Sequence, residues 1–150
     1  MSGYILDLRK EVGHRTLMQV GASVIVEDPA GRILLQRRTD NGTWGYAGGS
    51  VDIDEVVEDA ARRELLEETG LVAEDLQLLG IFSGPEMHYI YPNGDEVSNV
   101  DHVYIVKKYS GTLSPQSGEV EELRFFEKDA LPDNICPMNT AAIRLWKESK

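Results

Sequence analysis

Apolar side chains recur along the chain in short alternating runs, the pattern of β-strands that bury one face. These runs predict strands at Gly21–Glu27, Arg32–Arg38, Leu76–Phe82 and Val100–Tyr109, with a short apolar run at Leu123–Phe126. Two short edge strands are expected at Tyr4–Asp7 and Thr16–Met18. Turn residues at Asp28-Pro29-Ala30-Gly31 and Pro92-Asn93-Gly94-Asp95 predict two hairpins, the first joining the two strands around it.

Two stretches have helical periodicity instead. One helix is expected to begin just after Asp54 and to end near Thr69, with Gly70 just past its end. Asp54 is the expected N-cap, and a capping box of Asp52 and Glu55 competes with it. The second helix, at Asn139–Lys147, is amphipathic. Strands on both sides of a helix predict a mixed sheet with helices packed on it, in one domain over residues 1–150.

The first helix places carboxylates on the side that looks buried. At about 100° per residue, Val57, Ala60 and Ala61 fall within roughly 60° of Glu64, and so do Glu67 and Glu68. Like charges this close raise each other's pKa, and burial raises it further. A hard cation would neutralise such a cluster, and an oxygen-only ligand set suits Mg²⁺ or Mn²⁺.

Charge and composition exclude several other classes of protein. Lys and Arg total 15 against 26 Asp and Glu, a net charge of −11, which argues against binding a nucleic-acid polymer. Cys136 is the only cysteine, so no internal disulfide is possible and a reducing cytoplasm is the expected location. No apolar run approaches the 18 residues of a membrane span, and the first residues do not form a signal peptide.

The residues around the carboxylate helix carry a longer pattern. Gly49, five residues, Glu55, seven residues and then Arg63-Glu64-Leu65-Leu66-Glu67-Glu68-Thr69-Gly70-Leu71 match every fixed position of G-x5-E-x7-R-E-U-x-E-E-x-G-U, with U apolar. This pattern resembles the box of the Nudix hydrolase family, and its MutT-type members in particular. The resemblance implies an α/β/α sandwich with a central mixed sheet. It also implies hydrolysis of a diphosphate linked to another moiety, with Mg²⁺ or Mn²⁺ held by the box helix.

The resemblance assigns roles within the box. It implies that Glu64 and Glu68 are metal ligands, that Glu67 is a ligand or a base near the attacking water, and that Arg63 orients a box glutamate. The carbonyl of Gly48 resembles the family's backbone ligand. The alternative is a solvated acidic patch with an exposed arginine. Glu55 could hold the loop or an outer metal, or could favour only the helix dipole.

Outside the box the resemblance implies four further site residues. Glu119 is the favoured extra acid, as ligand or base, against a solvated acidic run with Glu121 and Glu122. Arg38 matches a phosphate-contacting arginine, or is a solvated strand end. Tyr46 is placed to stack on a base, and Asn139 to read a purine edge, although Asn139 could simply cap the last helix. Cys136 is expected to be structural.

Three positions depart from the family pattern. Ala47 stands where proline is usual, Asp54 where glycine is usual, and Val56 where Ser or Thr caps the helix. None of them removes a metal ligand. They put in question the stiffness of the loop and the start of the helix.

The substrate expectation is a nucleoside triphosphate, including an oxidised purine such as 8-oxo-dGTP, cleaved to monophosphate and pyrophosphate. It follows from the resemblance at Arg38, Tyr46 and Asn139. ADP-ribose or another nucleotide sugar is the alternative within the enzyme class. A non-catalytic nucleotide sensor is the alternative outside it. A homodimer is an expectation from the family alone.

Overall fold

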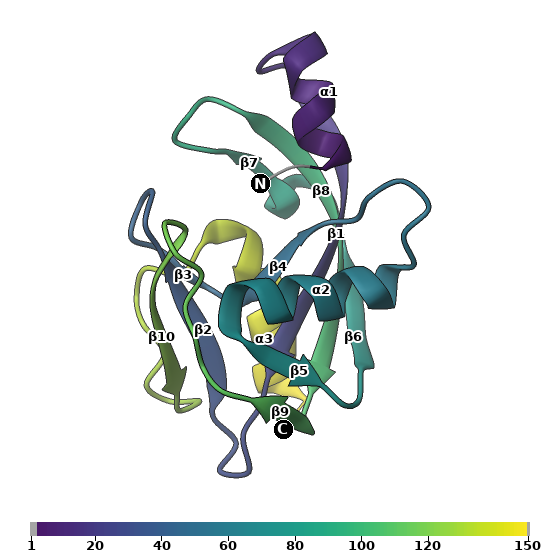
Figure 1. Ribbon diagram of the computed structural model, residues 1–150. Helices are drawn as coiled ribbons and strands as arrows, with labels where there is room; N and C mark the ends of the chain where they lie inside the picture. Colours follow the sequence, from purple (N-terminus) through teal and green to yellow (C-terminus); the bar gives the residue numbers. More distant parts are fainter. Residues whose placement is uncertain (1–2, 150) are drawn as a thin grey trace.

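The computed structural model describes residues 3–149, which form an α/β fold built on a mixed five-stranded sheet (Figure 1). Four of its strands follow the order β4 (Ala47–Ser50), β1 (Leu17–Val26), β8 (Glu96–Val106) and β6 (Gln77–Phe82). The fifth, β7 (His88–Ile90), also pairs with β8. β1 and β8 run parallel and the other pairs antiparallel, which confirms the mixed sheet.

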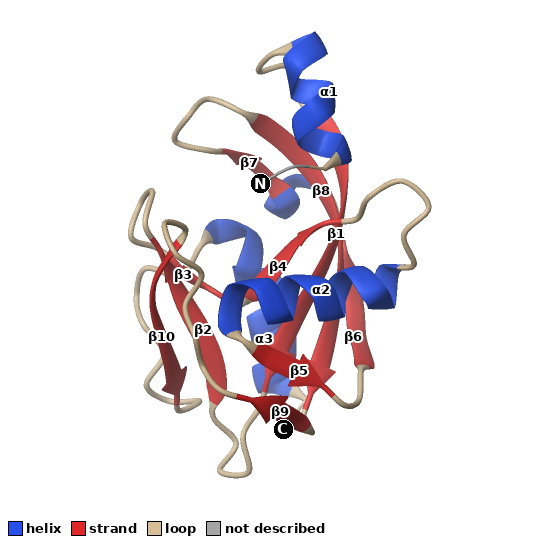
Figure 2. Ribbon diagram, viewed as in Figure 1, coloured by secondary structure: helices blue, strands red, loops and turns tan. Residues whose placement is uncertain are grey.

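Two smaller sheets and three helices complete the fold (Figure 2). One sheet has the order β10 (Val120–Phe126), β2 (Ile33–Arg38) and β3 (Trp44–Gly45), and the other pairs β5 (Leu71–Ala73) with β9 (Tyr109–Gly111). The α-helices are α1 (Tyr4–Val12), α2 (Val57–Thr69) and α3 (Thr140–Glu148), and 3₁₀ turns lie at η1 (Pro85–Met87) and η2 (Pro137–Asn139). None of the helices in residues 3–149 is long and apolar enough to cross a membrane.

A separate hydrophobic core lies against each face of the five-stranded sheet, so both faces are buried. Val24 and Val26 of β1 pack with Ala61 and Leu65 of α2, whereas Ile25 points the other way into a core with Trp146 of α3. In Figure 1, α2 lies in front of the sheet and α3 behind it. This alternation along β1 explains the sandwich, since each successive side chain of a strand faces the opposite layer.

The N-terminal prediction was wrong. Tyr4–Asp7 belongs to helix α1 and is not an edge strand. Four residues were too short a window to show the helical recurrence of Tyr4, Ile5, Leu8 and Val12. Thr16–Met18 is not a separate short strand: Leu17 begins the longer strand β1, whose first residues pair with β8 alone, while β4 joins only from Gly21 onward.

Of the first predicted hairpin, only the turn and the one residue pair next to it are present. The turn forms, with Asp28 Oδ1 accepting hydrogen bonds from Ala30 N and Arg32 N at 3.0 and 2.8 Å. Beyond the single bridge between Glu27 and Ile33, β1 and β2 separate into different sheets. The run Val100–Tyr109 is likewise divided, because β8 ends at Val106 and Tyr109 begins β9.

The start of α2 also differs from the prediction. The helix begins at Val57, and its N-cap is Val56, which offers no side-chain hydrogen bond. Asp54 does not cap it, since this residue adopts a left-handed φ of 61° in the preceding turn. The predicted contact between Glu55 and Asp52 N forms at 3.0 Å, but it closes that turn instead of capping the helix. Gly70 ends the helix as expected, with φ 80° and its N–H bonded to Leu66 O.

Two neighbouring leucines of α2 test how this helix is held. Leu65 is fully buried in the core under α2, whereas Leu66 is 52% exposed. We expect Leu65→Ala to lower the free energy of unfolding by about 2–5 kcal/mol, since it leaves a cavity. Leu66→Ala, the matched control, should change it by at most about 0.5 kcal/mol. Urea denaturation measures both, and equal losses would contradict this packing.

Candidate active site

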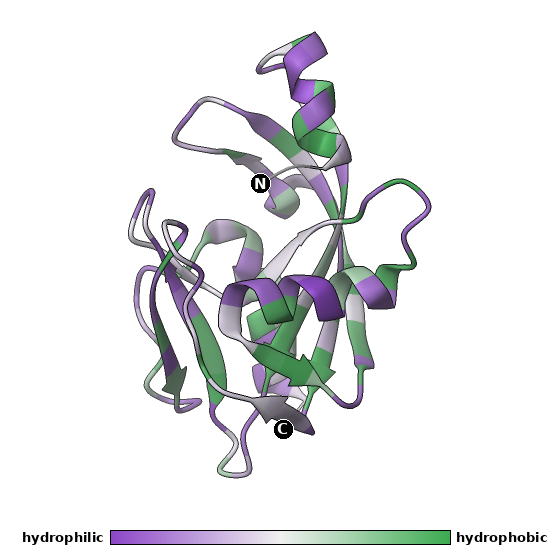
Figure 3. Ribbon diagram, viewed as in Figure 1, coloured by the Kyte–Doolittle hydropathy of each residue, from purple (hydrophilic) through white to green (hydrophobic). Residues whose placement is uncertain are grey.

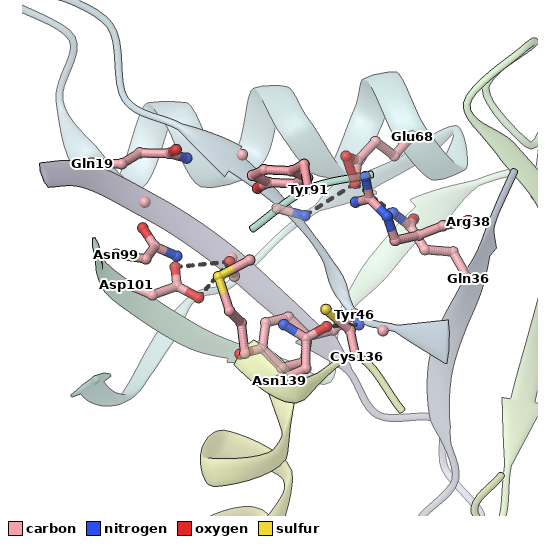
Figure 4. A pocket seen from close by; sticks show the side chains of 16 residues that line it. Gln19, Gln36, Arg38, Tyr46, Glu68, Tyr91, Asn99, Asp101, Cys136 and Asn139 are labelled. Atoms are coloured by element: carbon pink, nitrogen blue, oxygen red, sulfur yellow. Dashed lines mark hydrogen bonds between the residues drawn. The ribbon is translucent and has the colours of Figure 1, made fainter. Parts of the chain in front are cut away.

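A polar pocket opens beside the C-terminal end of α2, and residues from most of the sheet line it (Figure 4). One end is formed by Glu68, Gln36 and Arg38, and the opposite end by Asn99, Asp101 and Gln19. Further lining comes from Gly21, Ser23, Gly45, Tyr46, Gly48, Gly49, Tyr91, Cys136, Met138 and Asn139. The pocket therefore contains five of the residues predicted from sequence: Arg38, Tyr46, Gly48, Glu68 and Asn139.

Two glutamates of α2 are buried against the glycines of β4. Glu64 and Glu68 are only 1% and 6% exposed. A Cβ on Gly49 would lie 2.4 Å from the carboxyl carbon of Glu64, so only glycine leaves room for this carboxylate. Glu68 Oε1 accepts hydrogen bonds from Gly48 N at 3.0 Å and from Gln36 Nε2 at 2.8 Å. The position of Glu64 therefore depends on the glycine at 49, and Glu68 is held by the backbone of Gly48.

Arg63 ties the box together from the side. Its guanidinium donates to both oxygens of Glu55 at 2.8 and 2.9 Å and to Glu64 Oε1 at 2.8 Å. It also donates to Ser50 O at 3.1 Å and lies 3.6 Å from Glu67 Oε2. The Arg63 hydrogen bonds lower the pKa of Glu55. These contacts fix one Glu64 oxygen and bind the loop before α2 to the helix, which an exposed arginine would not do.

The buried carboxylates are electrostatically strained. Burial raises the pKa of Glu68 to about 8, and repulsion from Glu64 and Glu119 contributes. Burial also raises the pKa of Glu64, despite the opposing effect of Arg63. Glu64 Oε2 is buried without a hydrogen-bond partner in the described residues. A bound divalent cation would relieve both the repulsion and the unpaired oxygen, so the donor set fits such an ion.

The described residues supply only part of a metal site. Within residues 3–149, no three acidic, histidine or cysteine side chains converge as a preassembled metal site. The Glu67 side chain is 40% exposed, and its carboxylate lies 3.6 Å from Arg63. Glu64 and Glu68 would form the fixed part of the site, with Glu67 and the Gly48 carbonyl as further candidates.

Glu119 approaches these carboxylates from another element. It is exposed at the end of the loop before β10, and its backbone oxygen accepts a hydrogen bond from Thr39 N at 3.2 Å. Its charge is close enough to raise the pKa of both Glu64 and Glu68. Its neighbours Glu121 and Glu122 instead pair with Arg37 at 3.3 and 3.6 Å. Of these three glutamates, the geometry favours Glu119 as the extra acid.

The expected phosphate contact lies at the mouth of the pocket. Arg38 forms a two-pronged pair with Asp40, at 2.9 Å through Nε and 2.7 Å through a terminal nitrogen. Its guanidinium also lies 5.5 Å from the centre of the Tyr91 ring. Asp40 and Tyr91 therefore hold the cation in place beside Glu68, where an anionic ligand could share it.

Asn139 and Tyr46 are brought together beneath the pocket. Asn139 precedes α3, but its side chain forms no cap; Oδ1 accepts a hydrogen bond from Tyr46 N at 3.2 Å. Asn139 is thus the N-cap residue of α3 by position, as the alternative expected, but its side chain is used to bind the backbone of Tyr46. Gly45 makes room for it, since a Cβ there would lie 2.0 Å from Asn139 Oδ1. The Tyr46 ring is packed in the core under α3, which leaves little of it for stacking on a base.

One further buried carboxylate at the pocket was not predicted from the sequence. Asp101 of β8 is 2% exposed, and Ser23 Oγ donates a hydrogen bond shared between its two carboxylate oxygens, at 2.8 and 2.9 Å. Burial raises the pKa of Asp101 to about 6, and the Ser23 hydrogen bond opposes that shift. The signal was present in the sequence, because Asp101 shares the inward face of its strand with Val103 and Ile105.

Comparison with known proteins places these features in a family. A NUDIX domain model matches residues 17–146. A putative 8-oxo-dGTP diphosphatase of Bacillus subtilis is 44% identical over 127 residues, covering 85% of this chain and 78% of that protein. An ADP-ribose pyrophosphatase of Methanocaldococcus jannaschii is 36% identical over 104 residues, covering 67% of this chain. A MutT-like protein of Streptomyces ambofaciens is 43% identical over 65 residues, covering 43% of this chain.

The lengths of these relatives differ from that of this chain. The matched regions span 57% of the M. jannaschii protein and 41% of the S. ambofaciens protein. Among solved structures, a MutT NUDIX hydrolase from Burkholderia pseudomallei superposes with a TM-score of 0.73 at 31% identity, covering 86% of this chain and 98% of that one. A Bacillus halodurans MutT protein gives a TM-score of 0.67 at 28% identity, covering 86% and 80%.

The raised pKa of Glu68 predicts how the metal-free protein responds to pH. The unfolded carboxyl releases its proton near its ordinary pKa of 4.5, whereas the folded one keeps it up to about 8. The folded state thus binds more protons in between, so stability should fall as the pH rises through this window. Glu68→Gln should flatten that fall, and Glu58→Gln, on the exposed side of the same helix, should not. Urea denaturation at pH 5 and pH 8 in EDTA measures the difference; identical slopes in all three proteins would contradict it.

Proposed function

The chain belongs to the Nudix hydrolase family, and from that premise we propose that it hydrolyses a diphosphate linkage in a nucleoside triphosphate with a divalent metal, Mg²⁺ or Mn²⁺. One observation carries the proposal: Glu64 is buried against Gly49 and Glu68 against Gly48, and Glu68 lines the end of the pocket where Arg38 lies. Acidic oxygens and a cation at one end of a pocket suit the cleavage of a phosphoanhydride, which needs charge neutralised on several oxygens.

A bound divalent metal would stabilise charge on the phosphate oxygens and activate a water. Glu64, Glu67 and Glu68 would hold it, and the Gly48 carbonyl would add a backbone ligand. Arg63 fixes Glu64 Oε1 through its 2.8 Å hydrogen bond and so orients that ligand. Arg38, held by Asp40, binds the phosphate chain of the substrate. Water attacks one phosphorus as the P–O bond of the anhydride bridge breaks, and the leaving phosphate group departs with the bridging oxygen. The exposed Glu119 or Glu67 takes the proton of the water and passes it to solvent.

The substrate proposal is a nucleoside triphosphate, including an oxidised purine such as 8-oxo-dGTP, cleaved to monophosphate and pyrophosphate. The name of the B. subtilis relative supports this substrate, since the matched region covers most of both chains. ADP-ribose or a nucleotide sugar is the second candidate, supported by the name of the M. jannaschii relative. A sensor without catalysis would have no use for the full set of box glutamates. A cytoplasmic location and a homodimer stay predictions.

A substrate panel with one variant tests the proposal. Nucleoside triphosphates, 8-oxo-dGTP, ADP-ribose and nucleotide sugars are incubated with Mg²⁺ or Mn²⁺, and released monophosphate, pyrophosphate and phosphate are quantified. We expect turnover of triphosphates with pyrophosphate as product. Glu68→Gln should lower it about 100-fold or more, because a neutral amide replaces an anionic ligand worth several kcal/mol in the transition state.

Glu58→Gln is the matched control, since it makes the same change on an exposed part of α2 and should leave turnover unchanged. Full activity of Glu68→Gln would remove this residue from the mechanism. Tight nucleotide binding without any phosphate-containing product would favour the sensor, and turnover of ADP-ribose alone would favour the second candidate.

A further inference from the structure

The end of the pocket away from α2 also holds buried polar side chains in a closely packed arrangement. Asn99 and Asp101 are successive inward residues of β8. Gly21 lies directly opposite Asp101 in the parallel pairing of β1 with β8. A Cβ on Gly21 would lie 2.9 Å from an oxygen of each side chain, Asn99 Oδ1 and Asp101 Oδ1. The missing side chain of Gly21 therefore lets both polar groups occupy the pocket (Figure 4).

These polar groups have acceptor capacity that the described residues leave unused. Asn99 is 8% exposed, and its Oδ1 has no hydrogen-bond partner in residues 3–149. The two oxygens of Asp101 share the single hydroxyl hydrogen of Ser23, and the Tyr46 hydroxyl is a second donor within reach, although a carboxylate can accept about four hydrogen bonds. A buried acceptor left unsatisfied destabilises the fold, so an unfilled set of acceptors in a pocket indicates a ligand that supplies donors.

Each end of the pocket holds a buried carboxyl group, but only the end next to α2 also has an arginine: Glu68 and Arg38 lie there, and Asp101 lies at the opposite end (Figure 4). Arg38, together with the divalent ion of the proposed function, attracts an anionic phosphate chain to the end next to α2. Asp101 has no such cation beside it and repels that chain. Between the two ends, Tyr91, Cys136 and Met138 offer apolar atoms suited to a flat ring or a sugar.

We propose that Asp101, positioned by Ser23 and Gly21, is a specificity-determining residue that binds two adjacent hydrogen-bond donors on the nucleoside part of the substrate. The proposal rests on the proposed function for the placement of the phosphates. It adds the residue that recognises the nucleoside end of the substrate. Two groups of a nucleoside have this chemistry: the N1–H and 2-amino edge of a guanine ring, and the 2′,3′-diol of ribose. Adenine presents a donor beside an acceptor on the corresponding edge and fits the carboxylate less well.

The kcat/KM values of the wild-type enzyme for GTP, ITP, dGTP and ATP at pH 8 distinguish the two groups. ITP lacks the 2-amino group, and dGTP lacks the 2′-hydroxyl. Loss of one donor to the carboxylate should lower kcat/KM by about 10- to 100-fold. A large GTP-to-ITP ratio assigns Asp101 to the base, and a large GTP-to-dGTP ratio assigns it to the sugar.

Variants tie that ratio to Asp101. Asp101→Asn keeps the shape but turns one acceptor into a donor, so the selective ratio should fall toward one. Gly21→Ala retains Asp101 and should have the same effect, because the new Cβ displaces the carboxylate. Asp59→Asn removes the same charge from the exposed face of α2 and should leave the ratio unchanged. Thermal denaturation checks that each variant is folded.

Calorimetric binding of GMP, IMP and dGMP in EDTA gives a readout that needs neither metal nor turnover. Selective binding that Asp101→Asn abolishes supports the proposal even if no triphosphate is hydrolysed, an outcome that would overturn only the proposed function. Nucleotide turnover with both ratios near one would overturn the role of Asp101 and leave the hydrolase standing. An equal loss for all substrates in Asp101→Asn would also overturn it, by showing a purely structural role.

Discussion

The structure depends on the close approach of the carboxylates of α2 to the glycines of β4. Glu64 and Glu68 lie where a core-facing helix would normally place apolar side chains, and Figure 3 shows how hydrophilic α2 is for a helix packed on a sheet. Gly49 leaves room for the Glu64 carboxylate, and Gly48 N donates a hydrogen bond to Glu68, while Arg63 compensates part of the charge of Glu64. Burying two carboxyl groups, with one oxygen left unpaired among the described residues, destabilises the metal-free fold, and a divalent cation at the proposed site would offset that cost.

Much of this arrangement follows from spacing alone. The intervals i, i+3 and i+4 place Glu64, Glu67 and Glu68 on one side of a helix, and the neighbouring small residues identify that side as buried. The structure agrees for Glu64 and Glu68 but leaves Glu67 exposed, with its carboxylate 3.6 Å from Arg63. Periodicity gives the direction of a side chain to within a fraction of a turn. It does not say how far the partner surface extends, so the burial of Glu67 could not be read from sequence.

Local signals failed where tertiary contacts decided the outcome. The turn at Asp28–Gly31 forms as its residues predict, yet β1 and β2 enter different sheets because their long-range partners, β8 and β10, differ. Asp54 looked like a helix cap because its side chain can accept hydrogen bonds. The chain instead uses this residue for a left-handed turn, at the position where the family has glycine. That conformation lets Glu55 reach Asp52 N and Arg63, so the loop is closed by side chains in place of a stiff backbone.

Asp101 on β8 is the strand counterpart of the box glutamates on α2. A carboxylate on the buried face of an element indicates chemistry, and Asp101 lies on the buried face of β8, between Asn99 and Val103. A period of two is a weaker marker than a helical stripe, because one strand residue in two faces inward whatever its type. The pocket end was recognisable only when pairing placed Gly21 opposite Asp101 and Ser23 against its oxygens. Long-range register, which no local pattern encodes, joins the two polar ends into one site.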